Sequence, residues 1–149
     1  MKDRLHGVLS ISFVLISFVL ANVKLYFVSP ILGVGYTILI FAALLIILGV
    51  FCRKCPHLID NTCRHVFVGW IVVKLFTRKE PGRYTQFELL ATNIPLILVI
   101  LLPQYWLFQD LRFFIAFWVL TIVYILEIGF FVCKGCRNVY CEFCPKKMV

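Results

Sequence analysis

The sequence predicts an all-α integral membrane protein with four transmembrane helices in two hairpins and a cysteine-rich cap on the cytoplasmic side. Three observations predict this class. Hydrophobic residues make up 62% of the 149 residues, whereas soluble domains contain about 45–50%, and a soluble core of this size cannot bury so much apolar surface. The hydrophobic residues gather in four long stretches. All seven cysteines lie outside these stretches, in two clusters.

The transmembrane spans are predicted at residues 7–28, 31–51, 87–108 and 113–132. Each has the length of about 20 helical residues that crosses the hydrocarbon core. The first stretch lacks a small-residue cleavage pattern and runs through Ser29-Pro30 into the second, so we expect a retained helix and not a signal peptide. Pro95 and Pro103 fall inside the third span and predict a kink there. Residues 1–149 form one membrane domain.

The distribution of charge predicts which side each loop faces. Short turns join the helices of each hairpin, which leaves a loop at 52–86 and a tail at 133–149. An even number of spans places both termini and this loop on one side. That side carries thirteen of the fifteen Lys and Arg residues, and the other carries only Lys24 and Arg112. By the positive-inside rule the basic side is cytoplasmic, so the net charge of +8 does not indicate a nucleic-acid partner.

The loop contains a further apolar run at residues 66–76. Its eleven residues are too few to span a bilayer, and Trp70 suits the level of the lipid headgroups. We expect an interfacial or re-entrant segment. The charged Pro-Gly sequence that follows predicts that the chain leaves the membrane there.

Four cysteines in the tail have the spacing of a metal site. The pattern is C-x2-C-x4-C-x2-C-P, formed by Cys133, Cys136, Cys141 and Cys144. Two residues between cysteines allow one tight turn to direct both thiolates at a single ion, and the second pair completes a tetrahedral set. Cysteines beside a membrane also serve as small buried hydrophobes or palmitoylation sites. The paired spacing favours metal binding.

The loop supplies a second candidate ligand set. Cys52, Cys55 and Cys63 provide three thiolates, and His57 and His65 are both candidates for the fourth position. We predict Cys52, Cys55, Cys63 and His65 as the ligands. His65 pairs closely with Cys63, whereas His57 lies too near the first pair to approach the ion from the opposite side as readily. Ordinary interfacial roles for both histidines are the alternative.

A reducing cytoplasm disfavours lasting disulfides, so the cysteines are expected to bind metal. Both zinc and an iron-sulfur cluster fit these ligand sets, and the wider gap between the tail pairs slightly favours zinc. The basic neighbours of the thiolates offset their charge and lower thiol pKa values; they are Arg53, Lys54, Arg64, Lys134 and Arg137. A reactive redox pair is the weakest alternative, because these clusters have the size of metal sites.

The predicted spans lack the residues that a haem-binding protein or an ion pump needs. No histidine lies in the middle of a span, and His6 stands at the start of the first. Bis-imidazole haem binding between helices is therefore not expected. Lys24, Glu88 and Glu127 lie near span ends, where long side chains reach the interface. A charge relay at the midplane is missing.

These features predict a binding or assembly protein more than an enzyme acting on its own. We expect the lipid bilayer and a protein at the cytoplasmic face as its partners. The two metal-bound clusters would form one cytoplasmic cap, closed underneath by residues 66–76, that docks a partner or stabilises a membrane complex. The alternative is an electron-transfer subunit of a membrane redox complex, in which iron-sulfur clusters pass electrons at the membrane surface.

Overall fold

The computed structural model of the protein describes residues 2–55, 66–76 and 82–135, and this part of the chain is helical. The elements, in chain order, are α1 (Lys2–Val28), α2 (Pro30–Val50), the short 3-10 turn η1 (Cys52–Lys54), α4 (Val66–Leu75), α5 (Gln86–Leu101), α6 (Gln104–Phe108), α7 (Leu111–Glu127), the π-helical turn η2 (Ile128–Val132) and η3 (Cys133–Gly135). Four segments are long and apolar enough to cross a membrane: Leu5–Val28, Pro30–Lys54, Gln86–Phe108 and Leu111–Val132. The four predicted spans are confirmed, and the chain is a multi-pass helical membrane protein by architecture.

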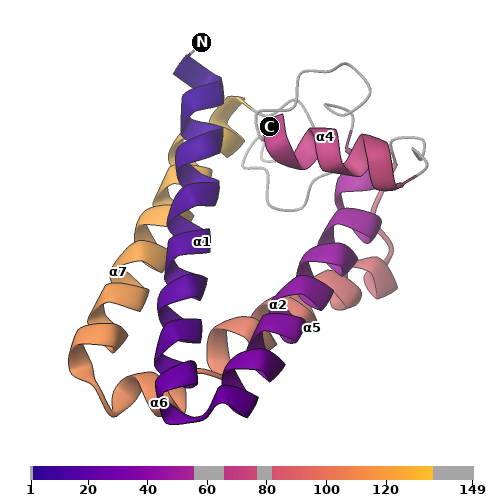
Figure 1. Ribbon diagram of the computed structural model, residues 1–149. Coiled ribbons are helices and arrows are strands. Elements are labelled where there is room, and N and C mark those ends of the chain that lie inside the picture. Colours follow the sequence, from indigo (N-terminus) through magenta and orange to yellow (C-terminus); the bar gives the residue numbers. More distant parts are fainter. Residues whose placement is uncertain (1, 56–65, 77–81, 136–149) are drawn as a thin grey trace.

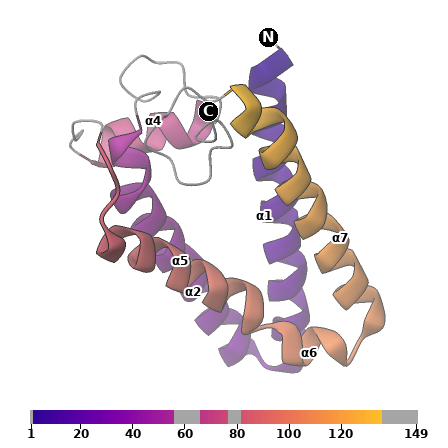
Figure 2. The same ribbon diagram turned by 180° about the vertical axis from the view of Figure 1, so that it is seen from behind.

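The spans form a V whose two arms diverge from one end of the molecule (Figures 1 and 2). One arm is α1 packed along α7, and the other is α2 packed along α5. Each arm therefore combines a helix from the first hairpin with a helix from the second. The helices of a hairpin meet mainly near their connecting turn and separate toward the other end.

The main core lies at the narrow end of the V, where every span contributes. It contains buried side chains from all of these helices: Ala21, Leu25, Tyr36, Ala43, Val99, Leu107 and Phe117. Half-buried aromatic rings surround this cluster, among them Phe113, Phe114 and Trp118. Most side chains farther along the arms are exposed on one side, as expected for helices whose outer faces contact lipid.

The third span is broken where the prolines predict a kink. Helix α5 ends at Leu101 and α6 begins at Gln104, although Pro95 is accommodated inside α5. Pro103 has no N–H and cannot bond the Val99 carbonyl four residues earlier. The hydroxyl of Tyr36 donates to this carbonyl instead, at 2.8 Å. A side chain of α2 therefore satisfies the backbone group that the proline leaves open.

The first hairpin turns tightly at Ser29, with Pro30 in the first turn of α2. Gly33 permits this close approach, because a Cβ there would overlap the ring of Tyr26 on α1. One turn farther along, the amide nitrogen of Asn22 donates to the Thr37 hydroxyl at 2.9 Å. Proline and glycine thus position the helix ends, and a polar pair joins them.

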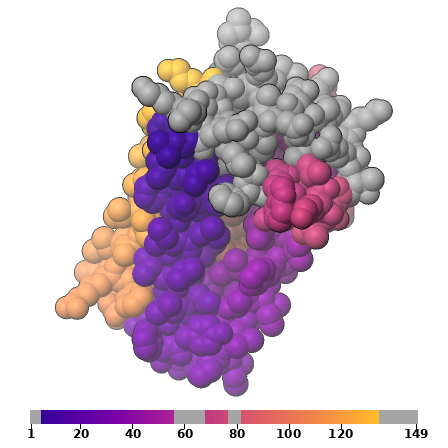
Figure 3. All heavy atoms as spheres, turned by 45° about the horizontal axis from the view of Figure 1, so that its top comes forward, coloured from indigo at the N-terminus to yellow at the C-terminus, as the bar shows by residue number. Residues whose placement is uncertain are grey.

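Helix α4 lies across the wide end of the V rather than along the spans (Figures 1 and 2). Its buried Val72 packs against Leu48 of α2, and the ring of Phe76 covers Gly49. The space-filling view shows α4 on the surface of this end (Figure 3). The exposed ring of Trp70 carries the ammonium of Lys74 at 4.2 Å from its centroid. A short helix in this orientation agrees with the predicted non-spanning segment.

Two ion pairs and one contact between a histidine and a carboxylate join the first half of the described chain to the second. His6 contacts Glu127 at 3.0 Å, Lys24 contacts Asp110 at 3.4 Å, and Lys54 contacts Glu88 at 2.6 Å. The first two pairs join α1 to the α7 segment at its two ends, and the third joins η1 to α5. The sequence predicts that Lys24, Glu88 and Glu127 lie near span ends and can reach the interface. In the structure each of them also has a polar partner on another element, which lowers the cost of a charge near hydrocarbon.

Candidate metal centre

The loop cluster begins where α2 ends. Cys52 opens η1, and Cys55 follows it in extended conformation, with its backbone N–H donating to the Cys52 carbonyl at 3.1 Å. Both thiols are partly buried. The C-x2-C pair thus forms one tight turn, which is the local geometry that a shared metal ion needs. The other predicted loop ligands, Cys63 and His65, and the alternative His57 lie outside the described residues.

Aromatic and polar contacts hold this turn against the start of α5. Tyr84 stacks on Phe51 with ring centroids 4.5 Å apart, and its hydroxyl donates to the Phe51 carbonyl at 3.1 Å. Lys54 donates to the carboxylate of Glu88, which also accepts from the backbone N–H of Thr85. Glu88 therefore caps α5 in a capping box and fixes η1 at the same time. Phe51, which precedes Cys52, is therefore held by Tyr84, and Lys54, which precedes Cys55, is held by Glu88.

The tail cluster begins where the fourth span ends. Helix α7 passes into the wider turn η2, and Cys133 follows directly as a partly buried thiol. The imidazole of His6, from the start of α1, lies beside this turn. It bonds the Glu127 carboxylate and stacks on Phe131, with ring centroids 4.3 Å apart. The remaining predicted tail ligands, Cys136, Cys141 and Cys144, lie outside the described residues.

The two clusters begin at the same end of the molecule but on different arms of the V (Figures 1 and 2). The end of α2 belongs to one arm, and η2 belongs to the other. The sequence suggested that the clusters leave neighbouring helix ends. The structure places those ends on different arms, at the wide end of the V.

Within the described residues, no three side chains of His, Cys, Asp or Glu form a group suited to one metal ion. Only Cys52, Cys55 and Cys133 of the eight predicted ligands belong to that part of the chain. The predicted four-ligand sets therefore stay predictions. Their first members, Cys52 and Cys133, directly follow the second and the fourth span.

Basic residues are the neighbours of these cysteines along the chain. Arg53 and Lys54 follow Cys52 within η1, and Lys134 follows Cys133 within η3. The side chains of the first two have other contacts: the guanidinium of Arg53 lies 5.9 Å from the ring centroid of Phe76, and Lys54 donates to Glu88.

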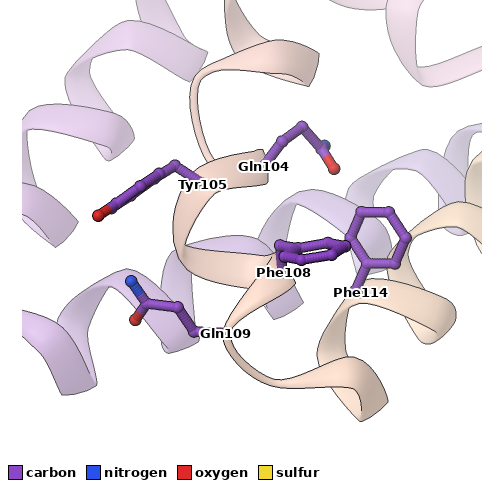
Figure 4. A pocket seen from close by; sticks show the side chains of 5 residues that line it. All are labelled: Gln104, Tyr105, Phe108, Gln109 and Phe114. Atoms are coloured by element: carbon purple, nitrogen blue, oxygen red, sulfur yellow. The ribbon is translucent and has the colours of Figure 1, made fainter.

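The described part of the chain also forms a pocket of about 450 Å³ at the narrow end of the V. Gln104, Tyr105, Phe108, Gln109 and Phe114 line it (Figure 4). The Gln104 amide is already engaged, donating to the Ile100 carbonyl and accepting from the Trp118 indole. Because this pocket is at the opposite end from the cysteines, it is not part of the candidate metal centre.

Two residues near the tail cluster were not predicted as parts of a site: His6 and Glu127. Glu127 carried a usable signal, because an ionisable residue in an apolar span usually has a specific partner. The partner itself was not predictable, since His6 is 121 residues away in the chain. The sequence matches no known protein family, and no curated protein or solved structure shows significant similarity to it.

Proposed function

We propose that the protein is a four-helix membrane protein whose cysteine clusters bind metal and build a cap for docking a partner or assembling a membrane complex. Zinc is the proposed metal. The proposed ligands are Cys52, Cys55, Cys63 and His65 for one ion and Cys133, Cys136, Cys141 and Cys144 for the other. The basic end of the molecule would face the cytoplasm.

The observation that carries this proposal is the position of the two cluster origins. Cys52 and Cys133 terminate spans from different arms, yet both are at the wide end of the V. Metal sites that start there would connect the arms where the helices are farthest apart. Metal binding contributes directly to folding, by about 10 kcal/mol or more for structural zinc in small domains. Such sites would stabilise the wide end of the V, which lies away from the main hydrophobic core.

Helix α4 supports a cap at this end. It lies across the opening between the arms and packs on the last turns of α2 through Val72. Its exposed surface carries Trp70 and Lys74. An exposed surface of this kind, framed by the two proposed metal sites, would be suited to holding another protein at the membrane boundary.

Metal analysis tests the proposal. The full-length chain is purified without oxygen, and zinc, iron and acid-labile sulfide are measured per polypeptide together with the absorption spectrum. We expect two zinc ions per chain and no visible colour. A variant with all seven cysteines replaced by serine, prepared in parallel, gives the background.

Other outcomes are equally clear. Iron and sulfide with a brown colour would replace the zinc proposal by the electron-transfer alternative, in which clusters pass electrons at the membrane surface. Zinc and iron at the level of the serine variant would refute metal binding in both forms.

A further inference from the structure

The π-helical turn η2 changes the direction in which the tail cluster leaves the membrane. In an uninterrupted α-helix, residues nine apart lie about half a turn from each other, so Cys133 would face away from Tyr124. A π turn takes in one extra residue and removes roughly 100° of this rotation. The turn at Ile128–Val132 therefore brings Cys133 back toward the side of the helix that carries Tyr124.

The wide turn therefore sets the direction in which Cys133, the first predicted tail ligand, leaves the fourth span. Turns of this type are rare and are frequent at functional sites.

His6 contacts this turn at two levels. Its ring nitrogen lies 3.0 Å from a carboxylate oxygen of Glu127, the residue immediately before η2. Its ring also stacks on Phe131 inside η2, with an interplanar angle of 7°. The side chains of His6 and Glu127 are only 29% and 19% exposed. His6, near the start of α1, thus contacts both the residue that precedes the π turn and a residue within it.

We propose that His6 is a positioning residue for the tail metal site: by holding Glu127 and Phe131, it keeps the π turn formed and fixes the direction in which Cys133 leaves the helix. This inference rests on the proposed function for its consequence, which is the affinity of the tail site for metal. The geometric part, the direction of Cys133, does not require a bound metal. His6 acts through the helix and is not a ligand.

A matched control exists at the other end of the same helix pair. Lys24 and Asp110 also join α1 to the α7 segment, at 3.4 Å, but they are far along the helices from Cys133. Lys24→Ala removes an ion pair between the same two helices without touching η2. Comparison with this variant shows whether an effect of His6→Ala comes from the π turn itself or from a general loss of stability in the α1–α7 arm.

The first measurement uses metal-free protein. A full-length variant that retains only Cys52 and Cys133 carries a spin label on each thiol, and the distance between the labels is measured by pulsed electron paramagnetic resonance. We expect one narrow distribution. His6→Ala should broaden the distribution and shift its mean, and Lys24→Ala should leave it unchanged. An unaltered distribution in His6→Ala, or the same broadening in Lys24→Ala, would overturn the inference even if the protein binds no metal.

The second measurement follows zinc affinity in the chain with all its cysteines, by competition with a chromophoric chelator. His6→Ala should weaken the tail site by about 10–100-fold, as removal of a supporting residue does at other metal sites, while excess zinc still gives the full stoichiometry. Lys24→Ala should bind like the parent. Loss of one zinc ion in His6→Ala would make His6 a ligand and refute its positioning role.

Discussion

The Tyr36 hydroxyl donates a hydrogen bond of 2.8 Å to the Val99 carbonyl, the group that Pro103 leaves without its helical donor. Tyr36 is buried on α2, and Val99 is buried on α5. This one contact therefore joins the two helices of an arm at the position where the third span breaks. Because both groups are buried, water cannot replace the Tyr36 hydroxyl as the donor to this carbonyl. The hydrogen bond therefore contributes more to stability than an exposed one would.

Tyr36→Phe should lower the free energy of unfolding by about 1–2 kcal/mol, since it leaves the Val99 carbonyl without a donor. The effect is measured by denaturation in detergent. In the background of Pro103→Ala, which restores a backbone N–H opposite that carbonyl, the same tyrosine substitution should cost much less. Tyr105→Phe, at an exposed ring, is the control and should be nearly neutral. Equal costs with and without Pro103 would show that the hydroxyl does not serve the broken backbone.

Gly33→Ala should destabilise the first hairpin by about 1–3 kcal/mol, because the added methyl group overlaps the ring of Tyr26 and forces the turn apart. Gly35 lies two residues away on the same helix, and a Cβ there meets nothing within 4 Å. Gly35→Ala should therefore be neutral or slightly stabilising. The same detergent denaturation compares both variants, and equal stability of the two would disprove the close-packing role of Gly33.

The spans were predictable from sequence because hydrocarbon thickness sets helix length, and long apolar stretches have few other uses. The break near Pro103 was predictable for a similar reason, since proline always removes a donor. Which helices pack together was not predictable. The spans are apolar on most sides, so no amphipathic face indicates that α1 should pack on α7 and α2 on α5.

The candidate site was predictable only where the information is local. Two cysteines at C-x2-C spacing define a turn by themselves, as Cys52 and Cys55 illustrate. The contact of His6 with Glu127 joins the two ends of the described chain and depends on the packing of α1 against α7. The π turn before Cys133 was not predicted, because the apolar residues 128–132 have the same pattern as the rest of the span.

The side assignment can be tested by thiol labelling. With thirteen basic residues on one side and two on the other, the positive-inside rule places all seven cysteines in the cytoplasm. A membrane-impermeant maleimide applied to intact cells should therefore label none of them, even after metal is removed. Gln109→Cys, at the exposed turn before α7, should become labelled and serves as the positive control. Labelling of the natural cysteines from outside would contradict the assignment.

The tail cluster is predicted to be one four-cysteine site, so a single substitution should abolish it. Cys136→Ser or Cys141→Ser should lower the zinc content from two ions per chain toward one and reduce thermal stability, because structural zinc contributes to folding. His6→Ala serves as a control for stoichiometry and should retain both ions at excess zinc. Full metal content in the Cys136 variant would show that the four tail cysteines do not form one site.

The last prediction distinguishes the two histidines of the loop. Asp60, Asn61 and Thr62 provide turn-forming residues between the first cysteine pair and the pair formed by Cys63 and His65. A returning chain can then present Cys63 and His65 from the side of the ion opposite η1, where Cys52 and Cys55 already form a fixed turn.

His65→Ala should therefore weaken zinc binding at the loop site more than His57→Ala does. If His57 only supports a ligand, its removal should cost no more than about 10–100-fold in affinity, whereas removal of His65 leaves three ligands and should lower the zinc content itself. Zinc titration of both variants, in a chain whose four tail cysteines are replaced by serine, isolates the loop site. A larger loss for His57→Ala than for His65→Ala would reverse the assignment and make the residue next to Pro56 the fourth ligand.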